Sequence, residues 1–123
     1  MVSYPKKILI AEDSSLILSR LVKMLNRSRH VVSIFPAQTY EQAITILQRE
    51  LIDIALLDIH LRESSGIDLL RFAKNQLPGI CVVMFTNQSD RQVERLCKEL
   101  GAEHFLDKAK DFPFLPQLID SLL

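Results

Sequence analysis

The sequence predicts a single α/β domain built on an open parallel sheet. Three short apolar runs, at residues 8–11, 54–57 and 80–85, are each bounded by polar or turn residues, which is typical of strands buried on both faces of such a sheet. Apolar residues recur at helical spacing around residues 18–25, 43–47, 69–73 and 93–100. Strands that alternate with amphipathic helices are the pattern of an open α/β sheet.

The remaining elements follow from weaker signals. Runs at residues 31–35 and 104–106 complete five strand and helix repeats. Residues 39–42 and 89–92 match the capping box, in which a Ser or Thr and a Gln three positions later satisfy free amides at a helix start. Gly101 fits the position after a helix C-cap. Because proline is tolerated only near a helix start, Pro113 and Pro116 predict a short last helix running to the C-terminus.

Composition narrows the classes of function. The 123 residues fit one domain, residues 1–123, and no apolar run reaches the roughly 18 residues of a membrane span. Fifteen basic residues balance fifteen acidic ones, so no net field would gather nucleic acid or anionic lipid. Cys81 and Cys97 form no metal-ligand spacing and are expected to be apolar thiols. We therefore expect a cytoplasmic protein that binds neither nucleic acid nor membrane directly.

Polar side chains follow the predicted strands at their carboxyl ends, where open α/β sheets bind ligands. Glu12 and Asp13 follow the first strand, Asp58 the third, Thr86 the fourth and Lys108 the fifth. Carboxylates about 4 Å apart repel each other by about 4 kcal/mol per pair at an effective dielectric near 20, unless a cation intervenes. Oxygen ligands favour a hard ion, and Mg²⁺ suits few carboxylates beside a phosphate.

Asp58 is the candidate nucleophile, because the middle strand would place it between the acid pair on one side and Thr86 and Lys108 on the other. A carboxylate can attack phosphorus to give an aspartyl phosphate, while a cation and Lys108 neutralise the phosphoryl oxygens. Thr86 could donate a hydrogen bond to the phosphoryl group. Taken singly, these residues could be helix caps, turn residues or solvated charges. Their joint placement at four strand ends favours the chemistry.

This constellation resembles the signature of response-regulator receiver domains, the CheY-like superfamily, over nearly the whole chain. The residues that carry the resemblance are Glu12, Asp13, Asp58 with Gly66 following, Thr86 and Lys108. The resemblance implies a flavodoxin-like, doubly wound five-stranded parallel sheet with strand order 2-1-3-4-5 and five helices. It also implies a two-component phosphorelay protein that takes a phosphoryl group onto Asp58 from a histidine kinase or phosphotransfer protein.

The resemblance further implies a role for each site residue. Asp13, Asp58 and the backbone carbonyl of His60 would bind Mg²⁺, and Glu12 would help through water. Lys108 and Thr86 would act with Asp58 in the phosphoryl chemistry. Such a protein modifies itself and turns over no external substrate, so we do not expect an enzyme.

A two-state switch is also implied. Phosphorylation would draw the Thr86 hydroxyl inward, and the ring of Phe105, at the family's aromatic switch position, would follow. The surface that changes would comprise the fourth helix, the fifth strand and the fifth helix. It would meet an unknown output protein or domain, or a second copy of the chain in a homodimer.

The chain departs from the family pattern near the site. Ala109 follows Lys108 where the family usually has a proline in a cis peptide, which leaves a strained cis bond or a trans loop open. Asn87 stands where a small residue is common, and this alters access to the phosphoryl pocket. Arg62 replaces a proline that often follows the nucleophile, which should loosen that loop. His60 and Gln88 occupy the two positions that tune phosphoryl lifetime, and we hypothesise that His60 contributes to it.

Two other functions stay open. A degenerate receiver that takes no phosphate and only binds proteins is supported by Asn87 and Ala109, although the acids are intact. A small α/β enzyme is the second, either a flavodoxin-like protein or an aspartate-dependent phosphatase. Flavodoxins need a phosphate-binding loop after the first strand, but residues 12–17 contain no glycine and carry acids. A phosphatase would need a second acid where His60 stands.

Overall fold

The structure is a computed structural model that describes residues 5–28, 30, 32–62, 64–87 and 90–123. In chain order its elements are β1 (Lys6–Ala11), α1 (Ser15–Asn26), β2 (Val32–Ala37), α2 (Tyr40–Arg49), β3 (Ile54–Leu57), β4 (His60–Leu61), β5 (Ser64–Ser65), α3 (Gly66–Gln76), β6 (Cys81–Thr86), α4 (Arg91–Glu99), β7 (His104–Asp107), α5 (Lys108–Asp111), the 3₁₀ helix η1 (Phe112–Phe114) and α6 (Leu115–Leu122).

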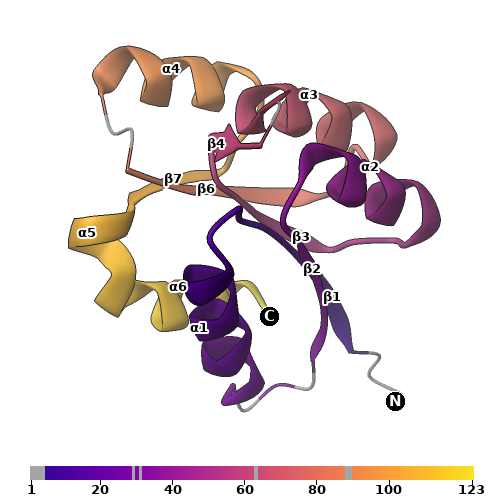
Figure 1. Cartoon of the computed structure of the whole chain (residues 1–123), viewed down its shortest axis with the longest axis vertical. Helices are drawn as coiled ribbons and strands as arrows, with labels where there is room; N and C mark the ends of the chain where they lie inside the picture. Colours follow the sequence, from indigo (N-terminus) through magenta and orange to yellow (C-terminus); the bar gives the residue numbers. More distant parts are fainter. Residues whose placement is uncertain (1–4, 29, 31, 63, 88–89) are drawn as a thin grey trace.

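Five parallel strands form the central sheet in the order β2-β1-β3-β6-β7, which confirms the predicted fold class and strand order (Figure 1). Ile8 of β1 pairs with Ile34 of β2 on one side and with Ile54 of β3 on the other. The chain leaves β1 for the outer strand β2 and returns across to β3. Strand order therefore reverses between β1 and β3, and a ligand site is expected beyond their carboxyl ends.

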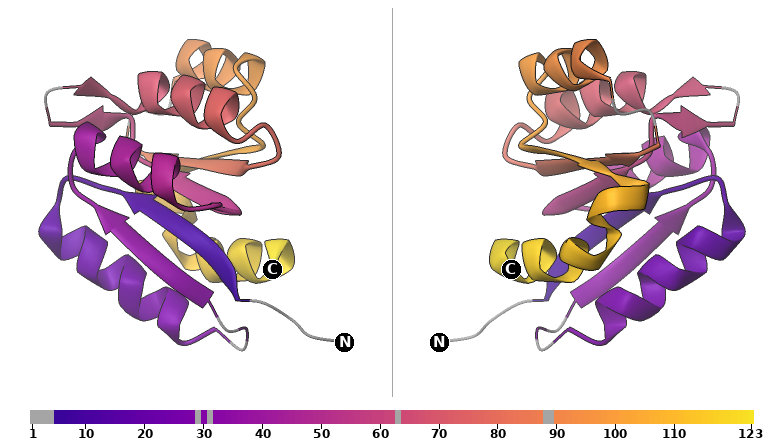
Figure 2. Two further views of the ribbon diagram at one scale, coloured as in Figure 1. Left: turned by 90° about the vertical axis from the view of Figure 1, so that its right-hand side faces the viewer. Right: turned by 90° about the vertical axis from the view of Figure 1, so that its left-hand side faces the viewer.

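Helices cover both faces of the sheet, and the strands supply alternate residues to two cores (Figure 2). On β1, Leu9 and Ala11 join the core under α2, α3 and α4, whereas Ile8 and Ile10 join the core with α1 and α6. Because both faces are buried, the strand sequences are continuously apolar. No helix of the described part of the chain is long and apolar enough to cross a membrane.

The two cysteines lie on opposite faces of this sheet. Cys97 is buried in the core beneath α4, and Cys81 is half-buried at the start of β6 against the other core. Burial raises the pKa of both thiols above the usual value. Both are therefore apolar packing residues of low reactivity.

The N-cap of α2 confirms the first predicted capping box in part. Thr39 Oγ1 accepts a hydrogen bond from the Gln42 amide at 3.1 Å. The Gln42 side chain, however, accepts from the amide of Gln38 at 2.8 Å, one residue before the cap. The helix start is as predicted, and the returning hydrogen bond is shifted by one residue.

The start of α4 differs from the prediction. Asp90 is the N-cap, and its Oδ1 accepts from the amide of Val93 at 2.8 Å, so a box beginning at Ser89 is wrong; Ser89 itself lies outside the described residues. Two adjacent residues could each cap, and the carboxylate one position later takes the role. Gly101 has a φ of 107°, as expected for the residue after the C-cap Leu100.

The C-terminal segment is a broken helix. Pro113 lies in the first turn of η1 and Pro116 in the first turn of α6, and each removes an amide that a continuous helix would need. The short final helix was predicted, whereas the separate turn of α5 before it was not. The ring of Phe112 packs against Phe85 of β6 with centroids 5.8 Å apart, which fixes this segment to the sheet.

A clamp of charged groups ties α3 to the amino end of β6. Lys74 Nζ donates to the carbonyl of Ile80 at 2.6 Å and forms an ion pair with Glu103. The other oxygen of Glu103 accepts from the amide of Val82 at 2.6 Å. These contacts hold the amino end of β6 in place, and they therefore help to fix the position of Thr86 at its carboxyl end.

We predict that Glu103→Ala lowers the free energy of unfolding by about 2 kcal/mol, because it leaves the Val82 amide without its side-chain acceptor and the Lys74 ammonium without its ion pair. Urea unfolding followed by circular dichroism measures the change. Glu94→Ala is the matched control, since Glu94 forms an ion pair with Lys98 at 3.1 Å on the exposed face of α4. It should cost less than about 0.5 kcal/mol. Equal losses in the two variants would contradict the clamp.

Candidate functional site

The first two acids of the site are fixed by backbone pairing just beyond the strands. The amide of Glu12 donates to the carbonyl of Ala37 at 2.9 Å, and the amide of Asp58 donates to the carbonyl of Ala11 at 3.0 Å. These bonds continue the parallel ladders by one residue past β1 and β3. The two carboxylates are thereby held at the place where the strand order reverses, as predicted.

Three carboxylates gather there. Glu12, Asp13 and Asp58 each offer an oxygen, and these atoms all lie within 4.8 Å of one another. Glu12 and Asp58 are only 2% and 5% exposed, whereas Asp13 is half-buried at the mouth of the site. Such a group of close, poorly solvated acids can bind a metal ion.

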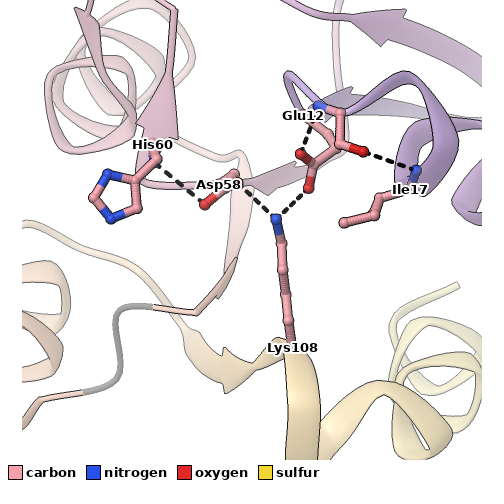
Figure 3. Close-up of polar contacts among 6 residues, drawn as sticks. Glu12, Ile17, Asp58, His60 and Lys108 are labelled. Carbon is pink, nitrogen blue, oxygen red and sulfur yellow. Dashed lines mark hydrogen bonds and ion pairs between the residues drawn. The ribbon is translucent and has the colours of Figure 1, made fainter.

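Lys108 reaches into the cluster from the end of β7 (Figure 3). Its Nζ lies 2.6 Å from Asp58 Oδ2 and also forms an ion pair with Glu12 Oε1. The Lys108–Ala109 peptide bond is trans. Of the two geometries left open by the sequence, the trans form is therefore the observed one, and it aims Lys108 at Asp58.

The charges in the site influence one another. Burial raises the pKa of the Glu12 carboxyl, although Lys108 and the amide of Ser14 favour its ionised form. Burial alone would lower the pKa of Lys108, but its bonds to Asp58 and Glu12 outweigh this and raise the pKa above the usual value. Lys108 therefore stays protonated, and its single ammonium faces three carboxyl groups.

The donor set fits a hard divalent cation. Glu12 Oε2 accepts from the amide of Ser14 at 3.0 Å, but the buried Glu12 Oε1 has no partner within the described residues other than the Lys108 ammonium. An acceptor left in this state gains from a cation nearby. All the donors are oxygens, which suits Mg²⁺ or Ca²⁺ better than a soft transition metal.

His60 meets the site through its backbone. Its amide donates to Asp58 Oδ1 at 3.2 Å, while its imidazole is exposed and directed away from Asp58 (Figure 3). That hydrogen bond and the one from Lys108 hold the two oxygens of Asp58 in fixed directions. The roles of the His60 carbonyl as a metal ligand and of its side chain in phosphoryl lifetime stay predictions.

Thr86 and Phe105 lie where the sequence placed them. Thr86 is fully buried at the carboxyl end of β6 and pairs in register with Asp107 of β7. Phe105, two residues earlier on β7, is half-buried against the core beneath α2, α3 and α4. The structure brings Thr86 to the edge of the sheet that carries the acids, while Phe105 lies further along the adjacent strand.

Comparison with known proteins gives the family. The model of the family described as "Response regulator receiver domain" matches residues 8–120, and this range includes every site residue named above. The chain belongs to the response-regulator receiver family. A receiver domain is a signalling module rather than an enzyme, and the pocket of Glu12, Asp13 and Asp58 is consistent with a phosphorylation site.

Relatives of this receiver domain agree in sequence and in shape. It is 34% identical over 104 residues to the alginate biosynthesis transcriptional regulatory protein AlgB of Pseudomonas putida, covering 83% of this chain but 22% of that protein. A CheY-like receiver domain from Methanospirillum hungatei has a TM-score of 0.86 at 24% identity, over 97% of this chain and 94% of that one.

A third relative is a response regulator of Burkholderia pseudomallei, with a TM-score of 0.84 at 19% identity, over 96% and 66% of the two chains. That structure contains a phosphorylated aspartic acid and a calcium ion. At this level of identity the solved structures establish the fold. The chain spans about a fifth to a quarter of the first curated relatives it matches.

Two departures of this receiver domain from the family pattern are visible. The loop after Asp58 forms the small antiparallel hairpin of β4 and β5, and Arg62 bridges to Thr39. Backbone pairing thus constrains the described part of the loop where the proline is missing, and the expected loosening stays a prediction. Asn87 is exposed and lines, with Arg20 and Lys108 among others, a pocket of about 200 Å³ between α1 and α5. Gln88 lies outside the described residues.

Gly66 has a role that the sequence did not reveal. It is the first residue of α3, and its amide donates to the carbonyl of Ile59 at 2.7 Å. A Cβ built at Gly66 would lie 1.8 Å from the carbonyl oxygen of Asp58. The backbone of the receiver's central acid therefore rests directly against a residue that has no side chain.

We predict that Gly66→Ala destabilises the receiver domain by at least about 3 kcal/mol, since the new methyl group must displace the backbone of Asp58. Urea unfolding measures the change. Gly79→Ala is the control, because nothing lies within 4 Å of a Cβ at Gly79, and it should change stability by less than about 1 kcal/mol. A Gly66→Ala protein as stable as the Gly79→Ala protein would refute the close approach.

Proposed function

We propose that this receiver domain accepts a phosphoryl group on Asp58 in a Mg²⁺-dependent reaction, and that a histidine kinase or phosphotransfer protein is the donor. The observation that carries the proposal is the position of Asp58. It is almost buried, lies among acids whose oxygens are within 4.8 Å of one another, and has Lys108 Nζ 2.6 Å from one of its own oxygens. Buried acids in such surroundings are functional-site candidates.

In the proposed reaction, an Asp58 carboxylate oxygen attacks phosphorus, and the bond from phosphorus to the donor atom breaks with its electron pair leaving on the donor. Lys108 would pass from the carboxylate to an oxygen of the incoming group and offset its charge. Thr86, fully buried at the next strand end, would donate its hydroxyl to another oxygen. A bound Mg²⁺, held by Asp13, Asp58 and the His60 carbonyl with Glu12 acting through water, would neutralise phosphoryl oxygens.

The proposed output is a shift between two conformations. Movement of the Thr86 hydroxyl toward the phosphoryl group would leave space at the end of β6 that the ring of Phe105 enters. The half-buried position of Phe105 in β7 supports this, since a ring already on the core side needs only a local change. The surface formed by α4, β7 and the segment from α5 to α6 would then bind an output protein, an attached domain or a second copy.

The proposal also covers the setting of the domain. We place it in the cytoplasm as one receiver domain over residues 1–123, acting through protein partners and without direct contact to nucleic acid or membrane. The balanced charge of the sequence supports this part.

We predict that incubation with Mg²⁺ and acetyl phosphate adds one phosphoryl group to the wild-type protein and none to Asp58→Asn, because the amide is a poor nucleophile. Intact-protein mass spectrometry detects the adduct. Asp68→Asn, which changes an exposed acid in the first turn of α3, is the matched control and should react like wild type.

The outcomes separate the three functions left open by the sequence. A stable, Asp58-dependent adduct supports the phosphorylation switch. Continuous release of phosphate without an accumulated adduct would instead indicate an enzyme. An unchanged mass in a folded wild-type protein would indicate the degenerate binding module and would overturn the proposal.

We predict that Asp13→Asn weakens Mg²⁺ binding at least about tenfold. Removing a residue that only hydrogen-bonds to a metal ligand can already cost that much affinity, and Asp13 is proposed as a direct ligand. Isothermal titration calorimetry measures the affinity. Asp68→Asn serves again as the control and should bind as wild type does. Equal affinities for wild type and Asp13→Asn would remove Asp13 from the proposed metal site.

A further inference from the structure

Two carboxylates, those of Asp107 and Asp111, hold the backbone around Lys108, and the family match gives neither of them a role. Asp107 directly precedes Lys108 and is the N-cap of α5: its Oδ1 accepts from the amide of Ala109 at 2.8 Å and from that of Lys110 at 3.0 Å. In return, Asp111 Oδ2 accepts from the amide of Asp107 at 2.8 Å. The two carboxylates therefore fix the backbone on both sides of Lys108.

From these contacts we infer that Asp107 is a positioning residue for the phosphoryl chemistry, acting through Lys108, and that Asp111 supports it. The inference rests on the proposed function. Asp107 pairs in register with Thr86 on β6, so the cap is built on the sheet itself. Lys108 begins α5 at the next residue, and its side chain spans from that cap to the acid cluster.

The chemistry of residue 109 explains why the cap can exist. Ala109 has a backbone amide, and that amide is one of the two donors that Asp107 binds. A proline at this position would have no such donor. The sequence Asp107, Lys108, Ala109 therefore holds the lysine by side-chain capping and a trans backbone.

Precise placement of Lys108 matters because its ammonium pairs with two acids in the unphosphorylated protein and must contact a phosphoryl oxygen in the proposed reaction. A single helix cap contributes only a small part of the stability of a whole domain, so its loss leaves the domain folded. A misplacement of about 1 Å of a charged group in a reacting site can cost up to about a hundredfold in rate. A large effect on rate with a small effect on stability is thus the expected mark of a positioning residue.

The test measures the rate constant of Asp58 phosphorylation by acetyl phosphate and Mg²⁺, using intact mass, in the full chain. We expect Asp107→Ala to slow the reaction about tenfold or more, and Asp107→Asn to restore most of it because asparagine caps helices equally well. Mg²⁺ affinity, measured by calorimetry, should stay within about twofold, since the ligand carboxylates are untouched. Asp90→Ala removes the equivalent cap of α4 and is the matched control, with a rate near wild type.

A double-mutant cycle shows whether Asp107 acts through Lys108. In a Lys108→Ala background, Asp107→Ala should cause less than about a twofold further loss, because residues that act as one unit are not additive. The same cycle in the free energy of unfolding, measured without any phosphodonor, should also show coupling between the two residues. That readout tests the inference even in a protein that takes no phosphoryl group.

Three results would overturn the inference. The first is a rate for Asp107→Ala within about twofold of wild type. The second is an equal loss in the wild-type and Lys108→Ala backgrounds. The third is a parallel fall in Mg²⁺ affinity, which would mean general damage to the site. A wild-type protein that forms no adduct would instead contradict the proposed function, and unfolding cycles without coupling would then refute the positioning role separately.

Discussion

The ion pairs of one ammonium group with two buried carboxylates hold the functional edge of this domain together. Lys108 meets Glu12 and Asp58, which come from different strands and are almost completely shielded from water. Removing such charges from water costs several kcal/mol per ion unless partners replace the solvent. The register of β1, β3 and β7 and the capped turn at α5 all serve to bring these partners together.

These ion pairs do not balance the number of acids in the site, because one ammonium meets three carboxyl groups. The raised pKa of Glu12 follows chiefly from its burial, with the nearby charge of Asp58 adding to it. A stability-optimised pocket would replace some of these acids with apolar groups. Their presence at a topological switch point lowers stability, and this fits the proposed binding of a divalent cation and a phosphoryl group. Because ligands must be deprotonated, occupation of the site should be linked to pH through Glu12.

The sequence predicted the sheet and the identity of the acid edge because both depend on strong signals. Continuous apolar runs have few alternatives to buried strands, and an acid that ends such a run can lie only at the sheet's edge. The details that the sequence did not reveal depend on choices between near-equal neighbours. Ser89 and Asp90 can both cap a helix, and Gly66 is compatible with any turn until the backbone of Asp58 is known to pass beside it.

The hairpin of β4 and β5 and the cap at Asp107 were missed for a different reason. Each strand of the hairpin is two residues long, which is too short for any periodicity to show. Asp107 follows a strand and precedes helix-compatible residues, which is an N-cap signature. The helix that it caps is only four residues long, which is too short for a helical periodicity to show.

Lys108 follows its partner Asp58 by 50 residues, so the contact joins distant parts of the chain. A chain emerging from the ribosome exposes its acids long before the lysine that neutralises them. Until β7 and α5 dock, mutual repulsion among the acids opposes closure of the sheet's carboxyl edge. The Lys108 ammonium offsets part of that repulsion, so charge adds to the apolar contacts that pack the last strand against the sheet. The contact between Lys108 and the two acids is therefore a long-range one, which is complete only when β7 and α5 pack against the rest of the sheet.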